Sequence, residues 1–118
     1  MIFISNIVIS LIGLIHFYIL VLEMFLWDKP YGLRTFGQSL EQATASKVLA
    51  ANQGLYNGFM AAGLFWALFL GRSGAGVKVF FLTCILIAGV YGAITANKKI
   101  LFIQAIPATI ALALLYFS

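Results

Sequence analysis

Long apolar runs with few charges are the feature that most constrains this 118-residue chain. The first run extends over residues 2–27, and three more lie within residues 40–70, 77–96 and 100–116. An α-helix needs about 20 apolar residues to cross the hydrocarbon core of a bilayer. The runs are continuous and do not alternate in polarity, which favours helices over the strands of a membrane barrel. The sequence therefore predicts an all-α, polytopic membrane protein with four transmembrane helices in an antiparallel bundle.

The composition excludes several other classes of protein. The chain is 64% hydrophobic and 8% charged, whereas soluble domains are about 45–50% apolar and about 25% charged. A soluble globular domain, a disordered chain and a nucleic-acid binder are therefore excluded. The net charge of +4 comes from basic residues at the ends of the runs, where lipid head groups and topology account for them. The single cysteine, Cys84, excludes an intrachain disulfide.

Turn and capping signals set the predicted boundaries within a single domain, residues 1–118. The segment from Asp28 to Gly32 indicates a turn, because proline and glycine do not continue a helix. The whole polar stretch 28–39 is accordingly expected to be a loop. Ser39 followed by Gln42 matches a capping box, so the second helix should begin directly after Ser39, ahead of the membrane.

The connections also predict an orientation. Short connections at residues 71–76 and 97–99 make successive helices antiparallel, with both termini on one side of the membrane. The connections after the first and third helices carry Lys29, Arg34, Lys47, Lys98 and Lys99, and the remaining one carries Arg72 and Lys78. The positive-inside rule predicts that the side with five basic residues is cytoplasmic and that the side with two, which also carries both termini, lies outside. No signal peptide is expected, because the first run is too long and lacks a basic start and a cleavage site.

Polar side chains inside the first run fall on one stripe of a helix. Its members are Asn6, Gly13, His16, Leu20, Glu23 and Trp27, spaced three, four or seven residues apart. A charged residue near the bilayer centre costs at least about 2.5–3.5 kcal/mol. In one interpretation, His16 and Glu23 are binding or acid–base groups joined by a bound molecule or water, since about 10.5 Å separates them along the axis. In the other, Glu23 is hydrated or paired with Lys47, and His16 is a neutral imidazole bonded to a neighbouring helix.

The second predicted helix has two distinctive faces. One face carries Asn52, Gln53, Tyr56 and Asn57, and the other carries Ala50, Gly54, Gly58 and Ala62. The amide-rich face can satisfy itself or a ligand but not lipid, so a structural network and a binding site are both open interpretations. The small-residue stripe permits close helix contact. In the fourth helix, Pro107 is expected to kink the chain.

Motifs that identify a reaction are absent from the sequence. It contains no phosphate-binding glycine loop, no Cys/His metal pattern and no nucleophile elbow. One histidine and one intramembrane glutamate make a poor metal site, because zinc sites offer three or four ligands. Catalytic residues, enzyme activity and cofactors therefore stay open at this point, and no metal is expected.

The chain resembles a family of small bacterial integral membrane proteins catalogued as a domain of unknown function. The resemblance is carried by His16, by the segment LEMFLW at residues 22–27 and by NQGLYNGF at residues 52–59. It covers nearly the whole length and implies a location in the bacterial cytoplasmic (inner) membrane. No reaction is assigned to the family.

A fainter similarity is to the membrane-associated proteins in eicosanoid and glutathione metabolism. Those proteins are four-helix bundles, usually trimers, and the chain is similar in its loop pattern, in Asn52 and in Tyr91. The chain departs from them in lacking the arginine-rich pattern of their second helix, which puts glutathione binding in doubt. Small multidrug transporters share the size, the helix count and a glutamate in the first helix, but Glu23 lies late in its helix.

These observations predict a membrane protein that binds a small amphipathic or lipid-like molecule in a polar intramembrane pocket. The expected lining is His16, Glu23, Asn52, Gln53 and Asn57, with Tyr56 and Tyr91 closing the pocket. The alternatives are a proton-coupled small-molecule transporter and a membrane enzyme resembling the eicosanoid and glutathione proteins. The expected partners are membrane lipids, a lipophilic small molecule and further copies of the chain, but not nucleic acid.

Overall fold

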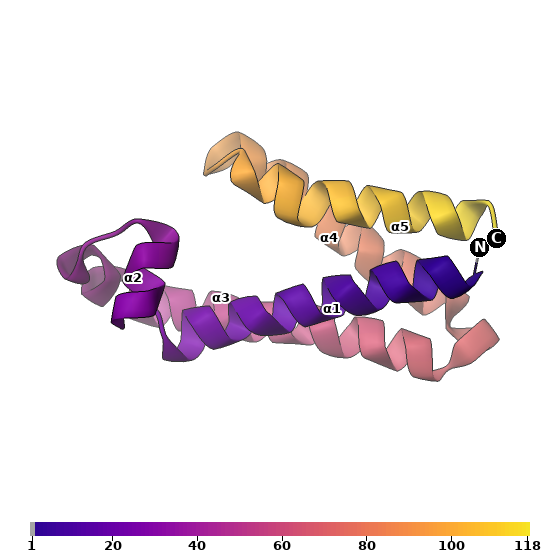
Figure 1. Cartoon of the computed structure of the whole chain (residues 1–118), viewed down its shortest axis with the longest axis horizontal. Coiled ribbons are helices and arrows are strands. Elements are labelled where there is room, and N and C mark those ends of the chain that lie inside the picture. Colours follow the sequence, from indigo (N-terminus) through magenta and orange to yellow (C-terminus); the bar gives the residue numbers. More distant parts are fainter. Residues whose placement is uncertain (1) are drawn as a thin grey trace. The chain divides into compact units, whose positions relative to one another are not determined.

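The computed structural model describes residues 2–118, and every regular element in that range is helical (Figure 1). The helices are α1 (Ile2–Phe25), α2 (Pro30–Phe36), α3 (Leu40–Phe69), the 3₁₀ turn η1 (Gly71–Gly74), α4 (Ala75–Thr95), the π-helical segment η2 (Leu101–Ala105) and α5 (Ile106–Tyr116). The all-α class expected from the apolar runs is confirmed.

The predicted turn is present at residues 26–29, directly before α2, but the predicted loop 28–39 was wrong over Pro30–Phe36, which form the short helix α2. Pro30 stands in the first turn of the helix, where the N–H that proline lacks would have had no partner. Gly37 ends the helix in the left-handed conformation, with φ 61°, as glycine commonly does at helix C-termini. Proline and glycine therefore bracket α2 and do not exclude it.

The predicted capping box at the start of α3 is confirmed. The Gln42 backbone N–H donates to Ser39 Oγ at 3.1 Å, and the Ser39 backbone N–H donates to Gln42 Oε1 at 3.0 Å. The reciprocal bonds satisfy two of the donors that a helix N-terminus leaves without intrahelical partners.

Two stretches among the described residues are long and apolar enough to cross a membrane, Ile2–Phe25 and Gly71–Thr95. The stretch Leu101–Tyr116 is apolar but shorter. Helix α3 has sufficient length, with 30 residues, but charged and amide side chains occupy its first half. Length and composition therefore indicate two candidate spans where the sequence predicted four.

The chain divides into two compact units that share helices α1 and α3. One unit is Leu14–Ala61 and the other joins the N-terminal residues up to Gly13 with Ala62–Ser118. We call Leu14–Ala61 the inner-sequence unit and the other the terminal unit. The first holds the end of α1, all of α2 and most of α3, and the second holds the start of α1, the end of α3, α4, η2 and α5.

The core of the terminal unit is aliphatic and closely packed. Its fully buried large side chains include Ile9, Ile12, Leu64, Leu82 and Ile85. Small residues bring α4 against η2 and α5, and the buried alanines there are Ala105, Ala108 and Ala111. A Cβ added at Gly89 would lie 2.7 Å from the Ala105 backbone nitrogen, so the two backbones nearly touch.

The kink expected at Pro107 stays a prediction, but the chain just before it departs from α-helical geometry. Proline cannot donate to the Ile103 carbonyl, and the chain immediately before α5 adopts the π-helical segment η2. Segments of this kind accommodate an interrupted hydrogen-bond ladder within a helix.

Candidate functional site

A hydrogen bond between Glu23 of α1 and Asn57 of α3 is the centre of the candidate site in the inner-sequence unit. Asn57 Nδ2 donates to Glu23 Oε1 at 2.6 Å, and to the Gln53 carbonyl of its own helix at 3.2 Å. Asn57 is only 6% exposed. When Glu23 is ionised its carboxylate makes this bond charge-assisted, which is the stronger class of hydrogen bond.

Two glycines of α3 allow this bond to form. A Cβ at Gly54 would lie 2.7 Å from Met24 Cγ and 3.0 Å from Glu23 Cβ, and one at Gly58 would lie 2.5 Å from Leu20 Cδ1. Absence of these Cβ atoms lets α1 and α3 approach closely, as the small-residue stripe predicted. Asn57 lies beside this stripe and therefore faces α1.

The other predicted residues of α3 lie elsewhere on the helix surface. Asn52 is exposed, and its amide donates to the Val48 carbonyl of the same helix at 2.9 Å. Gln53 is exposed as well, and the Tyr56 ring is 57% exposed with an edge-to-face contact to Phe59. Of the amide-rich face, only the Asn57 side chain meets the Glu23 carboxylate.

The remaining predicted residues are His16 and Tyr91. His16 is buried at 1% exposure within α1, in the inner-sequence unit. Tyr91 belongs to the terminal unit, where its side chain is 69% exposed.

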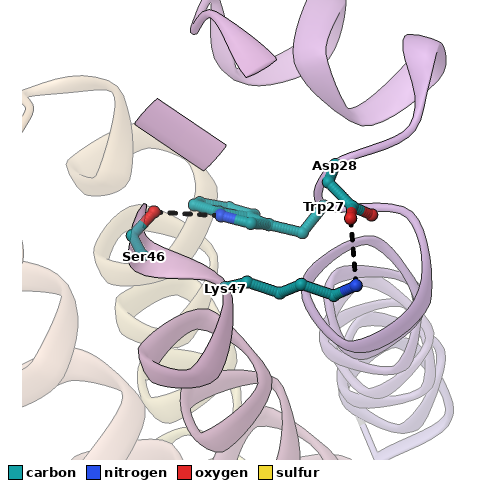
Figure 2. A network of polar contacts seen from close by, with 4 residues as sticks. All are labelled: Trp27, Asp28, Ser46 and Lys47. Carbon is teal, nitrogen blue, oxygen red and sulfur yellow. Dashed lines mark hydrogen bonds and ion pairs between the residues drawn. The ribbon is translucent and has the colours of Figure 1, made fainter. Parts of the chain in front are cut away.

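A second polar cluster joins the residues directly after α1 to the first half of α3 (Figure 2). Trp27 Nε1 donates to Ser46 Oγ at 3.1 Å, and Lys47 Nζ lies 2.9 Å from Asp28 Oδ2. Lys47 therefore pairs with Asp28, and the suggested pairing of Lys47 with Glu23 is wrong. Sequence reasoning missed this ion pair because Asp28 and Lys47 are distant in the chain and only the tertiary structure brings them together.

Helix α2 packs against the same end of α1. The Phe36 ring lies 4.7 Å from the Trp27 ring, measured between centroids. Gly32 is buried, and a Cβ there would overlap the Leu26 carbonyl oxygen. The hydroxyls of Tyr18 and Tyr31 are also hydrogen-bonded. The segment that the sequence predicted to be a polar loop therefore packs against the C-terminal end of α1.

The Asp28–Lys47 pair makes one prediction about pH. The hydrogen bond from Lys47 lowers the pKa of the Asp28 carboxyl. A lowered pKa means that the pair stabilises the fold above the ordinary Asp pKa and that this contribution is lost as the pH falls through the lowered value. We expect Lys47→Met to raise the Asp28 pKa toward its ordinary value, as measured by carboxyl-carbon NMR titration. Because both groups contact solvent, the effect on stability should be small.

Lys29→Met is the matched control for this titration. It removes an equal charge next to Asp28 in the sequence, but Lys29 contributes least to lowering the Asp28 pKa. Equal shifts of the Asp28 pKa in the two variants would show that any nearby positive charge lowers it, and that the hydrogen bond from Lys47 is not the cause.

The described residues do not bring three or more His, Cys, Asp or Glu side chains together in a metal-binding group. The Glu23–Asn57 pair instead offers one carboxylate with lone pairs beyond the one used by Asn57. Such a group can accept hydrogen bonds from a hydroxyl or amino group.

Comparison with known proteins places the chain in a family. The family model described as "Protein of unknown function (DUF1304)" matches residues 10–116. The uncharacterized protein YpaA of Lactococcus lactis subsp. lactis is 35% identical over 109 residues, which cover 91% of this chain and 92% of that protein. No solved structure matches the chain. The matched region holds the segments at residues 22–27 and 52–59 that carried the resemblance, and the chain therefore belongs to the DUF1304 family of proteins of unknown function.

Proposed function

We propose that this chain is a multi-pass protein of the bacterial inner membrane that binds a small amphipathic molecule at the Glu23–Asn57 pair. In this proposal α1, α3, α4 and the continuous stretch η2–α5 cross the bilayer as an antiparallel bundle. The basic residues of the α1–α3 and α4–η2 connections face the cytoplasm, and both termini face outward. Membrane lipids and further copies of the chain cover its outer surface.

The distribution of exposed apolar side chains supports a membrane location. Helix α4 exposes Phe80, Ile87 and Ile94 by 61%, 63% and 79%, spaced seven residues apart along one stripe. Helix α1 likewise exposes Phe3, Leu14 and Phe17 by more than half. Soluble monomers rarely expose large contiguous apolar surfaces, whereas lipid-facing helices do so along their whole length.

The length of α3 is compatible with a crossing. Its 30 residues make a helix of about 45 Å, and the hydrocarbon core is about 30 Å thick. The first third, which holds the two charged residues of the helix, Glu41 and Lys47, can therefore project beyond the core while the remainder crosses it.

The observation that carries the binding proposal is the Glu23 carboxylate, held at 2.6 Å by the buried amide of Asn57. Glu23 lies within an apolar helix, where an ionisable group is costly and commonly marks a functional site. Asn57 orients one carboxylate oxygen and leaves acceptor capacity for a ligand. The apolar surroundings favour a molecule with a hydroxyl or amino group at one end and a hydrocarbon body.

Native mass spectrometry of the detergent-purified protein tests this proposal. We expect a stoichiometric small molecule to co-purify with the wild-type chain, and its occupancy to fall about tenfold in Glu23→Gln, since charged hydrogen bonds contribute about 1.5–3 kcal/mol. Glutamine keeps an acceptor for Asn57, so the fold should be retained.

Glu41→Gln is the matched control, because it makes the same substitution at an exposed position in the first turn of α3. That variant should retain the molecule. Absence of any bound molecule, or equal occupancy in Glu23→Gln and the wild type, would show that the pair is structural.

A proton-coupled transporter is the second candidate, favoured by the same carboxylate within an apolar helix. It differs from a binding protein in one measurable property. Vesicles containing the wild-type chain would show substrate flux driven by a pH gradient, and Glu23→Gln would lose it. Absence of flux across a broad panel of amphipathic substrates would exclude this candidate.

A further inference from the structure

A pocket in the terminal unit combines two cations with apolar walls. Its volume is about 510 Å³, and it is lined by the start of α1, by η1 with the first turns of α4, and by the end of α5. The cationic lining residues are Arg72 and Lys78. The apolar walls include Val79, Leu112 and Leu115.

Lys78 is an unusual residue for this position. It is only 6% exposed, and its Nζ donates to Asn6 Oδ1 of α1 at 2.9 Å. Lysines near the end of a membrane helix ordinarily extend their ammonium group toward water and lipid head groups. Lys78, in the first turn of α4, is instead held inside the protein.

The charge of Lys78 has no carboxylate side chain in its own unit to balance it. All three acidic residues of the chain, Glu23, Asp28 and Glu41, belong to the inner-sequence unit. Asn6 supplies one neutral acceptor, whereas an ammonium group has three donors. Burying an ammonium group away from water is costly, so an anion bound beside Lys78 and its neutral acceptor Asn6 would stabilise this arrangement.

We propose that this pocket binds the anionic head group of an amphiphile, with its oxyanion between Arg72 and Lys78. The hydrocarbon chain lies along Val79, Leu112 and Leu115. Arg72 is exposed at the pocket, and its planar guanidinium can bond two oxygens of a phosphate or carboxylate at once. The site is separate from the Glu23–Asn57 pair in both position along the chain and sign of charge, and it does not depend on the function proposed there.

Native mass spectrometry with added lipids tests the site. The probes are phosphatidylglycerol, oleate and zwitterionic phosphatidylcholine, each added to delipidated, detergent-purified protein. We expect an anionic probe to bind with a stoichiometry of one, and phosphatidylcholine to compete poorly. Lys78→Met should weaken the binding about tenfold or more, the scale of a lost charge-assisted hydrogen bond.

Three further variants keep the test decisive. Lys98→Met removes an equal charge at an exposed position between α4 and η2, and it should leave binding unchanged. Arg72→Gln alters an exposed side chain, so it should weaken binding even if Lys78→Met fails to fold. Glu23→Gln should have no effect, which separates this site from the proposed function.

The choice of probe identifies the source of the anion. Binding of phosphatidylglycerol alone indicates a membrane phospholipid, and binding of oleate alone indicates a free fatty acid. The proposal would be overturned if neither anion bound, if phosphatidylcholine bound equally well, or if Lys98→Met weakened binding as much as Lys78→Met and Arg72→Gln.

Discussion

Asn57→Ala is expected to lower the free energy of unfolding by about 2 kcal/mol, which is within the range for leaving a partly buried charged group without its hydrogen bond. The substitution removes the Nδ2 that donates to Glu23 Oε1 at 2.6 Å, and little solvent can replace it because position 57 is 6% exposed. Thermal unfolding of the detergent-solubilised protein, followed by far-ultraviolet circular dichroism, measures the effect. A shift in midpoint of roughly 5–10 °C is expected for a chain of this size.

Asn52→Ala is the control for this prediction. Asn52 is the same residue type in the same helix, but it is exposed and bonds only to the Val48 carbonyl, so its replacement should change the midpoint little. A further test is the double variant Glu23→Met/Asn57→Ala. Because it removes both polar partners together, it should be more stable than Asn57→Ala alone. Equal midpoints for Asn57→Ala and Asn52→Ala would contradict the assigned role of the Glu23–Asn57 bond.

Gly32→Ala is expected to displace α2 from the end of α1 and to destabilise the chain by about 1–3 kcal/mol, the usual range for overpacking. The added Cβ would overlap the Leu26 carbonyl oxygen and lie 2.8 Å from the Leu26 carbonyl carbon. Backbone atoms cannot move aside as a side chain can, so α2 must shift. Since Phe36 of α2 packs 4.7 Å from Trp27, the tryptophan environment should change with it.

Trp27 fluorescence in a Trp66→Phe background reports this displacement, because Trp27 and Trp66 are the two tryptophans of the chain. Gly76→Ala is the matched control, because position 76 lies in α4 and an added Cβ there would meet no atom within 4 Å beyond its own chain neighbours and the nearby backbone of the helix. There the substitution should be neutral or stabilising, since alanine favours a helix by about 1 kcal/mol over glycine. An unchanged emission spectrum and midpoint in Gly32→Ala would rule out the close contact with Leu26.

Local signals explain why parts of the fold could be predicted from sequence. The capping box at Ser39 and Gln42 acts over three residues and needs no tertiary contact, and it was found where expected. Helix α2 was missed because proline was treated as a helix breaker. At the first turn of a helix the missing N–H costs nothing, and proline there is favourable.

The candidate site was predictable only in part. Sequence periodicity singled out both Glu23 and Asn57, because polar residues in apolar runs require an explanation. It grouped Asn57 with Asn52, Gln53 and Tyr56, since all four lie within about 140° of the helix circumference at 100° per residue. Which part of that arc meets α1 depends on how the helix is rotated, and Gly54 and Gly58 determine that rotation through close contact with α1.

The sequence by itself determined the helical class, the apolar character of the runs and membership in the family, because these depend on composition, local periodicity and the order of residues. The tertiary structure alone decided the pairings Glu23–Asn57, Asp28–Lys47 and Asn6–Lys78. Their members lie 34, 19 and 72 residues apart in the chain. Hydrogen bonds and ion pairs act over a few ångströms, so only packing of the helices selects which polar groups meet.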